Sequence, residues 1–128
     1  MTLRAPLRRV LGAGSAREGV RHWWLQRLSA VALVPLTVWF LVSILALPSL
    51  DHATVAGWMH GSTTALLLIL LVLTAAWHSQ LGVRVVVEDY VPAPGVRTVT
   101  LTLLTGAHAL LAAAGVFAVL RVALGAPA

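Results

Sequence analysis

The chain has 128 residues, of which 59% are hydrophobic and 10% are charged, and its formal net charge is +5. A mean hydropathy of +0.92 excludes a soluble domain of this size, because the surface of such a domain would need many more polar residues. The chain has no cysteine, so it cannot itself ligate an iron–sulfur cluster or form a thiolate zinc site. These properties predict an integral membrane protein in contact with a lipid bilayer.

Three apolar stretches are long enough to cross a bilayer as helices, because about 20 helical residues cover a hydrocarbon core of roughly 30 Å. They comprise residues 28–47, 62–83 and 98–120. Pro48 and Asp51 follow the first stretch and predict a turn, and Pro92 and Gly95 separate the second stretch from the third. We therefore predict an all-α fold, a bundle of three transmembrane helices.

The positions of the arginines predict how this bundle is oriented. Six arginines precede or open the first span, namely Arg4, Arg8, Arg9, Arg17, Arg21 and Arg27. Arg84 and Arg97 flank the second loop, whereas the first loop has no arginine. The positive-inside rule then makes the N-terminus and the second loop cytoplasmic, and it puts the C-terminus outside in spite of Arg121. This topology accounts for the net charge without a nucleic-acid partner.

The same pattern divides the chain into three parts. Residues 1–27 form a cytoplasmic N-terminal arm, residues 28–121 form the membrane-anchor domain, and residues 122–128 form a C-terminal tail. Arg27, His78, Asp89 and Tyr90 then lie near one membrane face, although they are spread over more than sixty positions.

His78 needs a physical reason, because a polar group in hydrocarbon is costly unless it is paired or coordinated. It either hydrogen-bonds a neighbouring helix or serves, as a neutral imidazole, as an axial ligand to a haem iron. Ala75 and Gly82 lie about one turn away on the same helical face, where their small size would admit a flat macrocycle. Small residues at this spacing also serve ordinary helix packing. No other histidine lies at the same depth, so a second iron ligand would come from a partner.

The other histidines have plainer interpretations. His108 lies near the middle of the third span with Thr105 as a hydrogen-bond partner, and we expect a structural role for it. His52 and His60 fall in the outer loop, where we expect solvated side chains.

Asp89 and Tyr90 end the stretch that follows the second span. They are suited either to interfacial anchoring and helix capping or to a quinone site. In the second case the phenol donates a hydrogen bond to a quinone carbonyl, and the carboxylate orients the phenol or relays protons. Arg27 would supply positive charge to a quinone oxygen or to a haem propionate.

At this point the residues resemble a known family. The segments GVRHWWLQRLSAVALVPLTVW at 19–39 and HSQLGVRVVVEDYV at 78–91 are similar to the hydrophobic membrane anchor (D) subunits of succinate dehydrogenase, respiratory complex II. The resemblance extends over all three spans, and its most specific part is the H-x3-G-x6-D-Y spacing.

The resemblance implies roles for individual residues. His78 would ligate haem b, whose iron takes its other ligand from the cytochrome b (C) subunit. Tyr90 would hydrogen-bond ubiquinone, Asp89 would support it, and Arg27 would lie by the quinone and the haem propionates. The family often has a histidine near the start of the first span that approaches a propionate. In this chain His22 lies next to the position that matches this histidine, and Arg21 can occupy that position.

The resemblance also implies an activity. The chain would anchor an enzyme in the bacterial inner (cytoplasmic) membrane, where a flavoprotein subunit and an iron–sulfur subunit pass electrons from succinate to ubiquinone. The chain alone would catalyse nothing. The nearest alternative is the anchor of a fumarate reductase, and an alternative of another class is a small structural membrane protein without a cofactor.

Overall fold

The computed structural model describes residues 15–125, so the first part of the N-terminal arm and the end of the C-terminal tail lie outside the described residues. The described residues form four helices and no strand, which confirms the all-α prediction. The helices are α2 (Ser15–Leu45), α3 (His52–Met59), α4 (Ser62–Tyr90) and α5 (Pro94–Ala123).

Three of these helices are long and apolar enough to cross a membrane, as predicted. The candidate spans are Gly19–Leu45, Ser62–Tyr90 and Pro94–Ala123, with 27, 29 and 30 residues. Each helix extends beyond the apolar stretch that marks it in the sequence. The extension of α4 contains an exposed ion pair between Arg84 Nε and Glu88 Oε1 at 2.8 Å, four residues apart, which adds a small stabilisation. The helix ends at Tyr90 just before Pro92, and Pro94 begins α5, so the connection is only three residues long.

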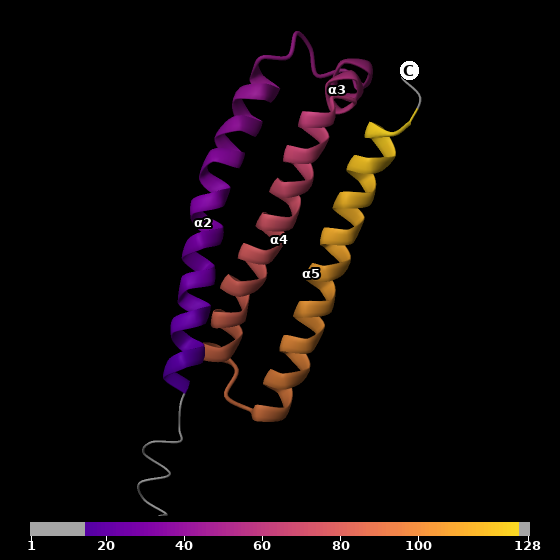
Figure 1. Ribbon diagram of the computed structural model, residues 1–128. Coiled ribbons are helices and arrows are strands. Elements are labelled where there is room, and N and C mark those ends of the chain that lie inside the picture. Colours follow the sequence, from indigo (N-terminus) through magenta and orange to yellow (C-terminus); the bar gives the residue numbers. More distant parts are fainter. Residues whose placement is uncertain (1–14, 126–128) are drawn as a thin grey trace, which may run out of the picture.

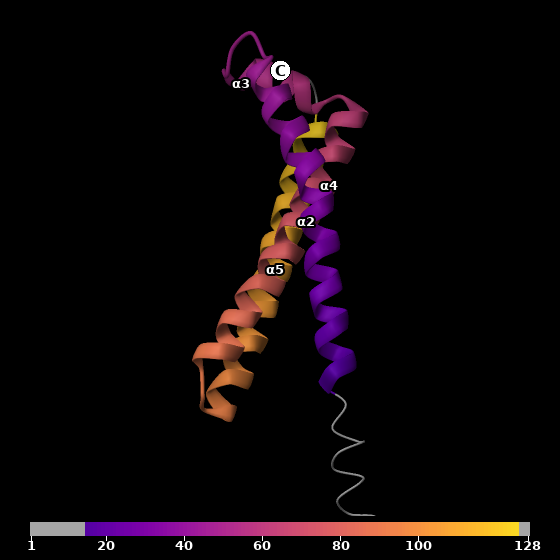
Figure 2. The ribbon, with the colours of Figure 1, turned by 90° about the vertical axis from the view of Figure 1, so that its left-hand side faces the viewer.

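Helix α4 lies in the middle of the bundle, between α2 and α5 (Figure 1). It packs against both neighbours, whereas the backbones of α2 and α5 do not approach one another. The N-terminal half of α2 diverges from the other two helices, as Figure 2 shows. The start of α2, the end of α4 and the start of α5 lie at one end of the bundle, here called the N-terminal end (Figure 1).

The internal core is small and lies toward the opposite end. Ala65, Leu68 and Val119 are buried together, and aromatic side chains of α2 and α3 pack on them. Many large apolar side chains of all three long helices are exposed in the isolated chain, among them Val31, Leu103 and Leu110. Such a surface requires lipid or partner helices to cover it.

Helices α4 and α5 pack closely at a glycine. A Cβ atom added at Gly115 would lie 2.7 Å from Val72 Cγ1, which is closer than two carbon atoms can pack. Because Val72 is β-branched and stiff, the contact requires a residue without a side chain at position 115. This glycine therefore sets the distance between the two helices.

The loop between the first two spans contains a helix that the sequence pattern does not reveal. Asp51 caps α3, since its carboxylate accepts hydrogen bonds from the Thr54 backbone N–H at 3.0 Å and from the Thr54 hydroxyl at 2.9 Å. The hydroxyl of Ser49 also donates to this carboxylate. The hydrogen bonds from Ser49 and from Thr54 lower the pKa of Asp51 from 3.8 to about 2.

The two histidines of this loop differ in their surroundings. His52 is exposed, as expected. His60 is partly buried, and its Nδ1 lies 3.3 Å from the carbonyl oxygen of Ala123 at the end of α5. The expectation of a solvated side chain is therefore wrong for His60, because this histidine donates to a carbonyl that the end of α5 leaves unpaired.

Candidate functional site

His78 lies on the side of α4 that faces α2 and is hydrogen-bonded to that helix through both ring nitrogens. Its Nδ1 is 2.9 Å from Ser29 Oγ, and its Nε2 is 3.4 Å from the amide nitrogen of Gln26. Ser29 is the one buried polar residue in the described part of the chain, with 8% of its surface exposed. The hydrogen-bonding interpretation of His78 thus agrees with the structure, and it leaves iron ligation open, because haem ligands keep hydrogen bonds on their second nitrogen.

Packing within this chain does not require a glycine at position 82, one turn from His78. A Cβ atom added at Gly82 would meet only the amide nitrogen of Gln26, at an ordinary contact distance of 3.5 Å. Gly115 on α5 differs in this respect, because a Cβ atom added there would collide with Val72, so packing does require a glycine at that position. Packing within this chain therefore does not explain the glycine at position 82, and a small residue here suits the approach of a flat ligand or of a partner helix.

The donor set fits an iron held in a macrocycle better than a bare metal ion. No group of three or more histidine, cysteine or acidic residues that could hold an ion is found in residues 15–125. Haem iron needs only axial ligands, and one neutral imidazole from this chain is sufficient. Near His78, the Oε1 atom of Gln26 is buried without a hydrogen-bond partner, as is His22 Nε2 on the preceding turn of α2. Both atoms are available to a polar group that the isolated chain does not provide.

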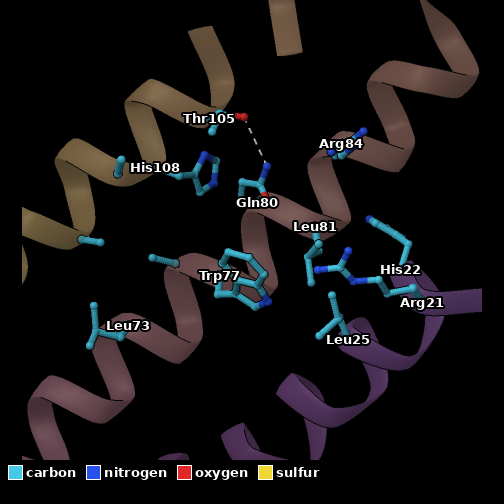
Figure 3. Close-up of a pocket in the computed structure, with 13 residues that line it drawn as sticks. Arg21, His22, Leu25, Leu73, Trp77, Gln80, Leu81, Arg84, Thr105 and His108 are labelled. Carbon is cyan, nitrogen blue, oxygen red and sulfur yellow. Dashed lines mark hydrogen bonds between the residues drawn. The ribbon is translucent and has the colours of Figure 1, made fainter. Parts of the chain in front are cut away.

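A pocket of about 570 Å³ lies between the N-terminal half of α2 and helices α4 and α5 (Figure 3). Arg21 and His22 of α2 line it opposite Trp77 and Arg84 of α4. Its remaining walls are largely apolar. The family resemblance leaves both Arg21 and His22 as candidates for the residue near a haem propionate. Both of them line this pocket. His78 does not line it.

His108 of α5 also lines this pocket, and both of its ring nitrogens are partnered. Nδ1 is 2.9 Å from the Leu104 carbonyl one turn earlier, and Nε2 is 3.2 Å from Ser79 Oγ on α4. The expected partner of His108 was Thr105, and this expectation is wrong. Thr105 instead donates to the Leu101 carbonyl and accepts a hydrogen bond from Gln80 at 3.3 Å (Figure 3).

The remaining predicted site residues lie at the N-terminal end of the bundle but apart from His78. Tyr90 is the last residue of α4 and is 81% exposed, and Asp89 is exposed beside it. Because α4 is continuous, Tyr90 lies twelve residues beyond His78, about 18 Å along the helix axis. Arg27 is exposed on α2, with its guanidinium carbon 5.2 Å from the centre of the Trp23 ring. No hydrogen bond among the described residues joins these side chains to His78, so they share one end of the bundle without forming a single cluster.

The pattern analysis missed the two residues that hold His78, Gln26 and Ser29. A signal for them exists, because they are polar residues three positions apart on one helical face where the apolar span begins. Their histidine partner, however, is 49 positions or more away in the chain, and a single sequence does not show which helices pack together.

Comparisons with known proteins agree with these observations. The model of the family described as "Succinate dehydrogenase/Fumarate reductase transmembrane subunit" matches residues 1–121. A "Succinate dehydrogenase hydrophobic membrane anchor subunit" of Paracoccus denitrificans is 31% identical over 121 residues, which cover 94% of this chain and 93% of that protein. A protein of the same description from Rickettsia bellii (strain RML369-C) is 34% identical over 88 residues, 69% of this chain and 70% of that protein.

A more distant relative has a similar description. The "Succinate dehydrogenase membrane anchor subunit" of Reclinomonas americana is 26% identical over 91 residues, 69% of this chain and 76% of that protein. The match of the family model is nearly as long as the chain, and the three apolar helices agree with a multi-pass membrane protein. The chain therefore belongs to the succinate dehydrogenase/fumarate reductase transmembrane subunit family.

Proposed function

We propose that the chain is the hydrophobic membrane anchor of a bacterial succinate dehydrogenase and that it helps to bind haem b and ubiquinone. Its partners are the cytochrome b (C) subunit, the iron–sulfur subunit and the flavoprotein subunit, in the inner membrane. The observation that carries the proposal is His78, a partly buried histidine on the central helix whose Nδ1 lies 2.9 Å from Ser29 of α2. Electrons from succinate reach the quinone at this anchor, and the chain has no activity of its own.

His78 would hold the haem iron through one imidazole nitrogen, and the cytochrome b subunit would supply another ligand. The bound haem would supply a site that accepts and releases one electron. Ala75 and Gly82 are small residues, so neither adds a long side chain where the macrocycle would approach His78. Arg27 and His22 lie on α2 at the N-terminal end, where their charge or N–H groups suit the haem propionates. The unpartnered, buried Nε2 atom of His22 supports this role.

Tyr90 and Asp89 form this chain's part of the quinone site. The Tyr90 hydroxyl donates a hydrogen bond to a quinone carbonyl, and Asp89 orients the phenol or relays protons. The high exposure of Tyr90 in the isolated chain supports this role, because the ring is available to a ligand or partner at the end of α4. Arg27 contributes positive charge as the quinone oxygen gains electrons.

The family description also includes fumarate reductases, which run the same chemistry in the opposite physiological direction. We favour the succinate dehydrogenase because the relatives compared above are described as such. An anchor without any cofactor is the alternative of a different class, and the spectrum of the purified complex distinguishes it from the other two.

The experiment compares two histidine variants in the purified complex. His78→Ala removes an axial nitrogen and should abolish or shift the reduced-minus-oxidised spectrum of haem b. His108→Ala is the matched control, because it removes a partly buried histidine whose two nitrogens are already occupied within the chain. Succinate oxidation with a soluble dye reports the upstream subunits in both variants. A complex without haem, or a His78 variant with an unchanged spectrum, would refute the proposed ligand.

A further inference from the structure

We propose that Ser29 is the positioning residue for His78, and that its hydroxyl accepts the Nδ1 proton so that the Nε2 lone pair is left for the iron. This inference rests on the proposed function, because it concerns how the proposed ligand is prepared. Ser29 belongs to α2 and His78 to α4, so the contact also fixes the ring by means of a second helix.

The direction of the hydrogen bond between Ser29 and His78 follows from the single proton of the serine hydroxyl. A serine hydroxyl has one proton and can accept at its oxygen at the same time. The Ser29 hydroxyl donates to the Gln26 carbonyl at 3.0 Å, within its own helix. This bond is the usual one for a helical serine, whose side chain bonds a carbonyl three or four residues earlier. With its proton engaged, Ser29 Oγ must accept from the ring nitrogen 2.9 Å away, and the proton is therefore on Nδ1.

A proton on Nδ1 determines the state of the other nitrogen. A neutral imidazole has one N–H, so Nε2 then carries a lone pair that can bind a metal. The neighbour of Nε2 agrees with this assignment, since the amide of Gln26 presents a nitrogen, which is a donor, at 3.4 Å. That distance exceeds the usual 2.9–3.0 Å, so the amide competes only weakly with an iron ligand.

Burial makes this contact difficult to replace. Ser29 is almost completely shielded, so a water molecule cannot easily take over the position of the hydroxyl when it is removed. Without it, the Nδ1–H group would be left without an acceptor and the ring would lose a contact that fixes its rotation. Partners of this kind raise the basicity of a ligating histidine, and their loss typically weakens metal binding by about 10- to 100-fold.

The test uses two variants of equal shape in the complete purified complex. Ser29→Thr keeps a hydroxyl on Cβ, whereas Ser29→Val replaces that hydroxyl with a methyl group. Ser79→Ala is a matched control. It removes a serine hydroxyl of α4 that contacts a different histidine, His108 of α5. For each complex, the measurements are haem retained on dilution, the midpoint potential of the haem, and dye-linked succinate oxidation as the check of assembly.

We expect Ser29→Thr and Ser79→Ala to retain haem like the parent complex. Ser29→Val should retain haem about 10- to 100-fold less tightly, and its haem potential should rise, because a less basic ligand stabilises ferric iron less well. The dye-linked activity should be unchanged in all three.

Several outcomes would overturn the inference. One is equal haem retention in the Ser29→Thr and Ser29→Val complexes, and another is a lowered haem potential in the Ser29→Val complex. A third is loss of assembly in both variants, which would mean that position 29 acts through packing alone. The His78→Ala complex separates this inference from the proposed function. If that complex keeps its haem, the ligand assignment itself fails, whereas if it loses haem and Ser29→Val does not, only the role of Ser29 fails.

Discussion

At the scale of single residues, the histidines of α4 and α5 differ in how their rings are held. His108 bonds a carbonyl of its own helix and a serine of α4, both at ordinary distances, so neither nitrogen is left over. His78 bonds only residues of another helix, and one of its two contacts is long. A ligand can replace that long contact at a small energetic cost, and this difference favours His78 as the residue that exchanges a protein partner for a bound group.

Tyr90→Phe tests the other end of the proposed site. The substitution keeps the ring and removes the hydroxyl, so one hydrogen bond to a quinone carbonyl is lost. Quinone reductase efficiency should fall roughly 5- to 150-fold, the range expected for a single hydrogen bond. The measurement is succinate–quinone reductase activity of the purified complex.

Succinate oxidation with a soluble dye is the control for Tyr90→Phe, because the flavin and iron–sulfur centres remain intact. If quinone and dye activities fall together, Tyr90 holds the assembly in place. If neither falls, the tyrosine serves as an interfacial anchor only.

His78 could be predicted as a candidate site residue from the sequence, but the residues that hydrogen-bond to its ring could not. A histidine at the end of an apolar run stands out, because the membrane makes an unpaired polar group costly. Ser29 and Gln26 are near the beginning of another span, where polar residues are common, and only the packing of α2 on α4 gives them a role. The wrong partner expected for His108 has the same cause: Thr105 is close in sequence, but Ser79 is the hydroxyl that the neighbouring helix brings to the ring.

At the scale of elements, α4 makes two different kinds of helix contact. Toward α5 it packs closely, with Val72 against the bare backbone of Gly115. Toward α2 it makes polar contacts through His78, and the nearby Gly82 could carry a methyl group without a clash. One helix therefore combines a tight structural interface with an interface suited to a ligand.

Gly115→Ala should destabilise the packing of α4 on α5. The added methyl group would overlap Val72, and such overpacking typically costs about 1–3 kcal/mol, more than the gain of up to about 1 kcal/mol from the better helix propensity of alanine. We expect a lower temperature of heat inactivation for the purified complex. Gly106→Ala is the control, because a Cβ added there meets nothing within 4 Å. Val72→Ala should restore the stability of the Gly115 variant, and failure to do so would mean that the clash is elsewhere.

The cap of α3 should depend on pH in a defined direction. The pKa of Asp51 is lowered to about 2 by its hydrogen bonds from Ser49 and Thr54, so the ionised carboxylate stabilises the folded cap. This stabilisation is complete above the ordinary value of 3.8 and is lost as the pH falls through about 2. Asp51→Ala should therefore increase hydrogen exchange in residues 52–59 at neutral pH, and the difference from the parent should disappear in strong acid. A difference that persists at low pH would contradict the role of the carboxylate.

The number and type of the spanning helices could be predicted, but not their ends. Hydropathy marks a span because the hydrocarbon core demands about 20 apolar residues. It does not mark the extension of α4 to Tyr90, because the first charge, Arg84, ends the apolar pattern although the helix continues past its ion pair with Glu88. Helix α3 is hidden for a related reason: it has only eight residues, and its sequence contains a glycine, a typical loop residue.

At the scale of the whole molecule, the chain is an incomplete bundle with most of its described arginines at one end, Arg121 of α5 being the exception. Its buried core is confined to a few residues, so most of its apolar surface depends on lipid or on partner subunits. Arg21, Arg27, Arg84 and Arg97 belong to the N-terminal half of α2, the end of α4 and the start of α5, which lie together (Figure 1). This arrangement supports the prediction that the N-terminal end faces the cytoplasm.

Two single-cysteine variants test this orientation, since the parent chain has no cysteine. Gly57 in α3 and Gly95 at the start of α5 are both exposed, and an added Cβ meets nothing within 4 Å at either position. In intact cells from which any outer membrane has been removed, Gly57→Cys should react with an impermeant thiol reagent. Gly95→Cys should react only after the cells are permeabilised and the complex is denatured. The reverse pattern would contradict the topology.

The central position of α4 has a consequence for the order in which the chain is made. Gln26, Ser29 and His78 all belong to α2 and α4, so the ribosome completes every member of this group before it begins α5. The last helix contributes the partner of Val72 and part of the pocket wall, but no hydrogen bond to His78. A chain truncated in the connection after Tyr90 would still encode Gln26, Ser29 and His78, and it would lack the close-packed partner of Val72 and the part of the pocket wall that α5 provides.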